Sequence, residues 1–203
     1  MRMPMWCIRG LSILALVFLL GTLPACKINV KKNEDESNKN VDIETPVGAL
    51  HVSEAPDIKS IGLALYPGAR PVEKEDDDDG NKKGANVNIA TPFFGLKVVA
   101  QEFESADSPD KLIAFYTRDL KKFGKVLQCH GSWNSAKNVN MDVGTDKSGE
   151  SKELRCENDG DGSTTELKVG TRDNQHLVAV KPQGKGARFV LVLVQMRGKD
   201  DMI

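Results

Sequence analysis

The segment FVLVLVQM at 189–196 most constrains the fold, because it is apolar on both of its faces. Side chains of a strand alternate between the two faces of a sheet, so each face of this segment carries a row of aliphatic or aromatic residues. Leaving a large apolar side chain in water forfeits about 1.5–3 kcal/mol. We therefore predict an interior strand with both faces covered. The second face would be covered by the N-terminal hairpins, a second copy or another partner.

Two segments upstream share one pattern, VDIETPVGALHV at 41–52 and VNIATPFFGLKV at 87–98. In both, alternating apolar residues are interrupted by Thr-Pro and a glycine, which is typical of a β-hairpin. The two segments align at an offset of 46 residues. An internal duplication and the independent use of the same turn chemistry both explain this repeat.

Residues 108–124 form the clearest predicted helix. Ser108 is the candidate N-cap, Pro109 suits the first helical position, and Gly124 fits the position after the last turn. Apolar residues recur on one side at helical spacing, which predicts a buried stripe. Its members are Leu112, Tyr116, Leu120 and Phe123, with Ile113 and Phe115 beside them.

The order of the remaining segments indicates the fold class. Strand patterns are found at 61–66, before a Pro67-Gly68 turn, and at 125–129, 153–156, 165–169, 176–181 and 187–196. Several strands, one helix and several strands predict an α+β fold, an antiparallel sheet with one main helix packed on one face and preceded by β-hairpins. A single domain is expected over 41–203.

The N-terminus carries a pattern of export. Arg2 and Arg9 accompany an apolar run at 11–20, and about ten residues suit a cleaved signal peptide better than a membrane span, which needs about 20. The four residues that follow this region, Leu23-Pro24-Ala25-Cys26, resemble the lipobox of bacterial lipoproteins. The resemblance implies cleavage of residues 1–25 and lipidation of Cys26.

This resemblance also implies a location. A lipid-modified Cys26 would hold the protein on a membrane of the cell envelope, and Lys27 in place of Asp favours the outer membrane. Residues 26–40 are polar after the cysteine, and we predict that they form a flexible tether.

Two cysteines remain once Cys7 leaves with the signal and Cys26 takes lipid. Because the envelope is oxidising, a disulfide between Cys129 and Cys156 on neighbouring strands is expected. It would close a loop of about 28 residues and stabilise the fold by about 3–4 kcal/mol. Two buried thiols and a metal site are the alternatives, although no Cys or His spacing typical of zinc is present.

Charge and motifs exclude several function classes. Loss of Arg2 and Arg9 leaves 26 basic and 29 acidic residues, a net charge of −3, so no nucleic acid partner is expected. No nucleophile elbow or phosphate-binding loop is present. We assign no catalytic residue, no metal ligand and no cofactor from the sequence.

A second resemblance concerns Tyr66-Pro67-Gly68-Ala69 and the later segment SADSPDKLIAFYTRDLKKFG at 105–124. A YPGA turn followed by a D-S-P-x-x-L-x-x-F-Y-x-x-x-L helix is similar to uncharacterised exported bacterial proteins. The resemblance covers residues 61–128 and implies an architecture without implying an activity.

Three functions follow as hypotheses. The first is a membrane-anchored, non-enzymatic binding or assembly module whose partner is an envelope protein or a second copy. The second is a Ca²⁺-responsive module that uses the acidic loops 73–84 and 157–162. The later loop has acids at the first positions of a calcium loop, but Lys168 stands where the bidentate Glu belongs. The third is a small envelope hydrolase.

Overall fold

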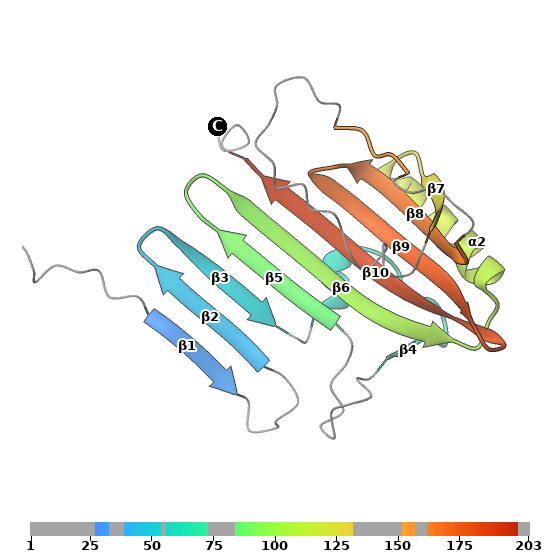
Figure 1. Cartoon of the computed structure of the whole chain (residues 1–203), viewed down its shortest axis with the longest axis horizontal. Helices are drawn as coiled ribbons and strands as arrows, with labels where there is room; N and C mark the ends of the chain where they lie inside the picture. The colour runs from blue at the N-terminus through green and yellow to red at the C-terminus, as the bar shows by residue number, and fades with distance from the viewer. Residues whose placement is uncertain are drawn as a thin grey trace, which may run out of the picture.

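The strands of this protein lie side by side in one open, antiparallel layer (Figure 1). The structure is a computed structural model that describes residues 27–32, 39–53, 56–72, 84–131, 152–156 and 162–198. Within these ranges the sheet order is β1-β2-β3-β5-β6-β10-β9-β8-β7, and the short β4 pairs with β6. The bounds are β1 Lys27–Lys32, β2 Lys39–Thr45, β3 Gly48–Ser53, β4 Arg70–Pro71, β5 Gly84–Ala90, β6 Gly95–Ser105, β7 Leu127–Gly131, β8 Thr164–Thr171, β9 Asn174–Gln183 and β10 Gly186–Arg197.

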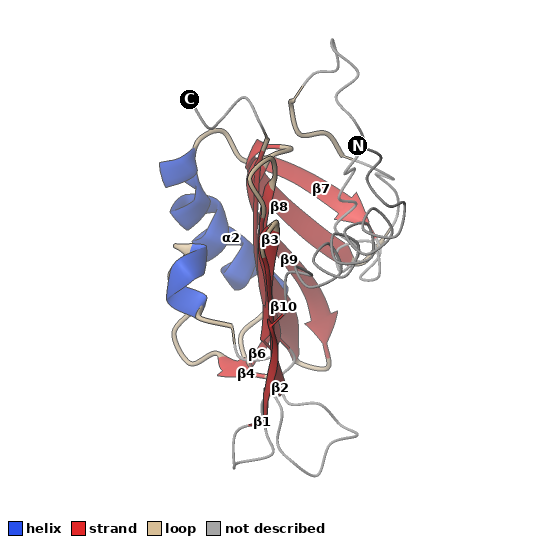
Figure 2. Ribbon diagram, turned by 90° about the vertical axis from the view of Figure 1, so that its left-hand side faces the viewer, coloured by secondary structure: helices blue, strands red, loops and turns tan. Residues whose placement is uncertain are grey.

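One main helix packs against one face of the sheet (Figure 2), which confirms the predicted α+β class. Helix α2 spans Pro109–Leu120 and continues as the 3-10 turn η2, Lys121–Phe123. A second 3-10 turn, η1, spans Ile58–Ile61 and packs on the same face. We call this side the helix face and the opposite side the second face.

The apolar stripe of α2 packs on the sheet as predicted. Leu112, Tyr116 and Leu120 are fully buried in one cluster with Phe189, Leu191 and Leu193 of β10. Phe123 departs from the prediction, since its side chain is 38% exposed. The backbone passes from α-helix to 3-10 helix before this residue, which takes its ring out of the stripe.

Strand β10 lies in the interior of the sheet, between β6 and β9, as the sequence predicts. On the second face, Val190, Val192 and Val194 are buried beside Leu177 and Ala179 of β9. Both rows of the strand are therefore buried, and the prediction of an interior strand is confirmed.

Both predicted hairpins form, but they do not fold across the second face. Strand β3 pairs edge to edge with β5, with Val52 opposite Val87, so the β2–β3 hairpin extends the sheet sideways. Its apolar side chains thereby join the same face as those of β6 instead of packing on top of them. The expectation that the hairpins cover the second face is wrong for the described residues.

The two hairpins share their register and turn bonds. Val41 pairs with Val52 as Val87 pairs with Val98. The hydroxyl of Thr45 donates to the carbonyl of Gly48, and that of Thr91 donates to the carbonyl of Phe94, each over 2.9 Å. An internal duplication and common turn chemistry both predict this shared geometry.

Residues 61–66 do not form the predicted strand. Their backbone N–H groups bond instead to side chains of α2: Ala64 N to Asp119 Oδ2 over 2.9 Å, and Tyr66 N to the hydroxyl of Tyr116 over 3.2 Å. The predicted turn is present, because Ala69 N donates to Tyr66 O and Gly68 has a left-handed φ of 76°.

The sheet begins before the predicted domain boundary at residue 41. Within the expected tether, 26–40, residues 27–32 form β1 and β2 starts at Lys39. Strand β1 pairs with β2 so that Ile28 and Val30 are in register with Ile43 and Val41. Residues 27–32 and 39–40 of the expected tether therefore belong to the sheet, whereas residues 33–38 lie outside the described residues.

Candidate functional site

The predicted site residues have different outcomes. Cys26 lies outside the described residues, so its lipidation stays a prediction. Cys129 on β7 forms the expected disulfide with Cys156, with the two Cα atoms 5.4 Å apart. Cys156 is not on a strand, however: within the segment 152–156 the structure has an isolated β-bridge, between Glu153 and Thr171.

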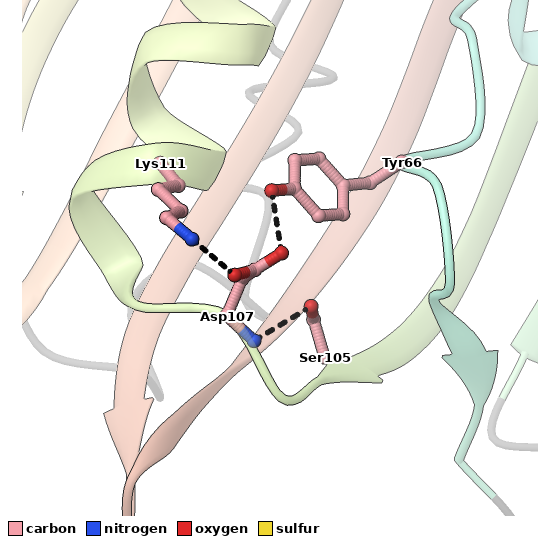
Figure 3. A network of polar contacts seen from close by, with 4 residues as sticks. All are labelled: Tyr66, Ser105, Asp107 and Lys111. Atoms are coloured by element: carbon pink, nitrogen blue, oxygen red, sulfur yellow. Dashed lines mark hydrogen bonds and ion pairs between the residues drawn. The ribbon is translucent and has the colours of Figure 1, made fainter.

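Polar side chains converge where the YPGA turn meets the start of α2 (Figure 3). The Tyr66 hydroxyl donates to Asp107 Oδ2 over 2.9 Å, and Lys111 Nζ donates to Oδ1 over 2.6 Å. The N–H of Asp107 donates to Ser105 Oγ over 3.1 Å. Asp107 Oδ2 therefore joins the YPGA turn to a segment 41 positions away, while Oδ1 bonds locally to the first turn of α2.

The electrostatics of this network keep the Asp107 carboxyl ionised and the Tyr66 hydroxyl protonated. Hydrogen bonds from Lys111 and then from Tyr66 lower the pKa of the Asp107 carboxyl. Burial, followed by the hydrogen bond to Asp107, raises the pKa of Tyr66. A carboxylate that stays ionised and a phenol that stays protonated exchange protons poorly at neutral pH. The network is suited to holding the turn and the helix together.

An open hollow of about 300 Å³ lies next to this junction. Its charged members are Arg70 on β4, Glu104 on β6 and Lys185 in the β9–β10 turn. Its full lining comprises Gly68, Arg70, Glu104, Ser105, Ala106, Gln183, Lys185, Gly186 and Ala187. Two cations and one carboxylate on an open surface can contact a small polar ligand, but they form no arrangement typical of catalysis.

Aliphatic residues make two rows across the second face, on the part of the sheet that α2 leaves uncovered. The first row runs from Val41 through Val52, Val87 and Val98 to Val194, in cross-strand register. The second runs from Ile43 through Leu50, Ile89 and Leu96 to Met196. We call these ten residues the aliphatic face.

The other side of the same strands is polar. Asp42, His51 and Asn88 lie opposite one another on β2, β3 and β5, and His51 Nδ1 contacts Asp42 Oδ1. Helix α2 packs on β8 and β9 and does not reach these strands. This part of the sheet is therefore amphipathic. Its polar side belongs to the face on which α2 packs (Figure 2), and its apolar side belongs to the second face.

The second face also carries charged residues outside the aliphatic face. Two ion pairs there are mostly shielded from water, Lys168–Glu166 with 2.9 Å between nitrogen and oxygen, and Arg188–Glu102 with 3.5 Å. The Lys168–Glu166 pair joins alternate residues of one strand, β8, whereas the Arg188–Glu102 pair depends on β10 and β6 becoming neighbours.

The histidines do not gather into one site. His51 lies on β3, His130 is exposed on β7, and His176 is buried on β9 with its ring stacked on Phe123 at a centroid distance of 3.8 Å. Among the described residues, no group of three or more His, Cys, Asp or Glu side chains can hold a metal ion. The candidate calcium loops lie almost wholly outside those residues, at 73–83 and 157–161, so calcium binding stays a hypothesis.

No helix in the described part of the chain has the length and hydropathy to span a membrane. Comparisons of the chain with protein families, with curated proteins and with solved structures find no match. The interpretation of function therefore rests on the residues and geometry of this chain.

Proposed function

We propose that this protein is a lipid-anchored, non-enzymatic binding module of the bacterial cell envelope, and that the aliphatic face binds its protein partner. The anchor is the diacylglyceryl-modified Cys26, and Lys27 directs the protein to the outer membrane. The observation that carries the binding role is the amphipathic extension of the sheet by β2, β3 and β5.

An apolar sheet face is stabilised when another layer packs on it. Here α2 supplies that layer on the helix face of β8 and β9, whereas the aliphatic face belongs to other strands on the other side. Its outer members Val41, Leu50, Val52 and Val87 are only half-buried. A continuous apolar patch with half-buried side chains is typical of a protein-binding surface.

The partner is an envelope protein or a second copy of this chain, and crosslinking in cells separates the two. A photo-reactive amino acid at Val87 lies on the aliphatic face, whereas one at Asn88 lies on the polar side of the same strand. We expect a discrete adduct from the Val87 variant alone. An adduct of twice the protein's own mass identifies a second copy, and any other discrete mass identifies another protein.

Equal adducts from both positions, or none from Val87, would overturn the binding role. The anchor is tested separately with Cys26→Ser, which should release the protein into the soluble fraction and abolish incorporation of labelled fatty acid. Persistence of this variant on the membrane would show that the lipobox assignment is wrong.

A further inference from the structure

The tips of the two matching hairpins expose apolar side chains. The side chain of Val47, in the β2–β3 turn, is 72% exposed, and that of Phe93, in the β5–β6 turn, is 67% exposed. The turn segments 45–48 and 91–94 contain Thr, Pro, Val, Gly and Phe and carry no charge. Two exposed apolar side chains at matching positions indicate a surface that can contact an apolar partner.

The two tips lie next to each other at one end of the sheet (Figure 1). Ala49, just after the first turn, is paired with Ala90, just before the second. The turns are close to each other, because a Cβ placed on Gly48 would lie 2.9 Å from Cγ2 of Thr91. Val47 and Phe93 therefore lie side by side at one end of the sheet.

Side-chain hydroxyls satisfy part of the backbone at each tip. Val47 N and Phe93 N each donate to the Oγ1 of the threonine two residues earlier, over 3.3 Å in both turns. Phe94 N donates to the same hydroxyl of Thr91 over 2.9 Å. Because an unsatisfied N–H is costly outside water, this bonding lowers the cost of moving the tips into an apolar environment.

The predicted anchor emerges at the same end of the sheet. Lys27, which directly follows Cys26, is paired with Glu44, the residue before the first turn. Neighbouring strands are about 4.8 Å apart, so β1 and the tip of β5–β6 are separated by about 15–20 Å across the strands at this end of the sheet. A lipid on Cys26 would therefore bring both tips close to the bilayer surface.

We propose that the two tips insert into the interfacial region of the membrane that holds the lipid anchor, so that the sheet stands end-on to the bilayer. This inference rests on the proposed lipidation of Cys26. Phe93 enters the region where aromatic rings are favoured, and Val47 adds a second apolar contact. The charged residues Glu44 and Arg197 lie behind the tips, at the level of the headgroups.

Tryptophan quenching tests this geometry in the lipidated full-length mature protein. Val47→Trp and Phe93→Trp are reconstituted into phosphatidylethanolamine–phosphatidylglycerol vesicles with or without brominated acyl chains. Lys185→Trp is the matched control, since Lys185 is exposed in the β9–β10 turn at the opposite end of the sheet. The wild type, which keeps Trp133, gives the background. We expect quenching of both tip variants and none of Lys185→Trp.

A flotation assay of the non-lipidated Cys26→Ser chain, at a large excess of vesicles, isolates the contribution of the tips, which is too weak to keep the chain on a membrane in cells without the lipid. The double change Val47→Ser and Phe93→Ser should lower its partitioning into the same vesicles by about tenfold or more, because two apolar side chains no longer leave water. Val47→Leu, which keeps the apolar character, should retain binding.

The outcomes separate this inference from the proposed anchor. Failure of the wild type to associate with vesicles, with no lipid on Cys26, contradicts the anchor. Firm association through a lipidated Cys26 without quenching of Val47→Trp and Phe93→Trp contradicts insertion of the tips. A blue-shifted but unquenched emission would assign the tips to a protein contact and would also overturn the inference.

Discussion

The disulfide between Cys129 and Cys156 is expected to supply a large part of the stability of this fold. The two cysteines are separated by 27 positions in the sequence. For a loop of this length, the loss of chain entropy in the unfolded state corresponds to about 3–4 kcal/mol at 25 °C. Whole domains are stable by only about 5–15 kcal/mol, so this single cross-link is decisive.

The test is urea denaturation of Cys129→Ala/Cys156→Ala against the oxidised parent, both in a Cys26→Ser background. Alanine is chosen because Cys129 is only 2% exposed, and a serine hydroxyl there would add a buried polar group. The free energy of unfolding should fall by about 3–4 kcal/mol, and the melting temperature by about 10 °C. The m-value should rise, since the unfolded chain without the cross-link exposes more surface.

Reductant supplies the control for this prediction. It should destabilise the parent by a similar amount and leave the alanine variant unchanged. A parent that loses less than about 1 kcal/mol on reduction would refute the reasoning, because the loop would then be constrained without the disulfide.

Two further predictions concern the helix face. In urea denaturation, Tyr116→Phe should lower the free energy of unfolding by about 1 kcal/mol, because the half-buried N–H of Tyr66 loses its acceptor. Tyr66→Phe changes a more exposed side chain and should have a smaller effect in the same assay. Burial, and then the charge of Lys122, lower the pKa of His176, while a hydrogen bond with the backbone of Ile61 opposes them. The unfolded state therefore binds this proton first, and stability should be full above pH 6.5 and fall as the pH drops below it. Thermal unfolding between pH 7.5 and 5.5 should show that His176→Gln reduces this loss of stability relative to the parent. The control His130→Gln, which changes an exposed ring, should not reduce it. An unchanged pH dependence in His176→Gln would contradict the assignment.

Several elements could be read from the sequence because local physics decides them. The Thr-Pro turns set the register of both hairpins, and the apolar stripe of Leu112, Tyr116 and Leu120 set the buried side of α2. The continuous apolar run at 189–196 required an interior strand, and β10 is one.

The tertiary structure alone decided how these elements meet. Alternation in 41–52 shows that one side of the hairpin avoids water, but it does not tell whether the hairpin packs face to face or edge to edge. In the structure β3 pairs edge to edge with β5, and this pairing creates the aliphatic face and places the two tips side by side.

Residues 61–66 illustrate the same limit. Their apolar pattern suits a strand, yet side chains of α2, Tyr116 and Asp119, take the N–H groups that a ladder would use. The hydrogen bond from Tyr66 to Asp107 likewise links residues 41 positions apart, and no local sequence pattern predicts it. The sequence by itself determined which residues avoid water, whereas the partners of the backbone hydrogen bonds depended on distant side chains and were settled only in three dimensions.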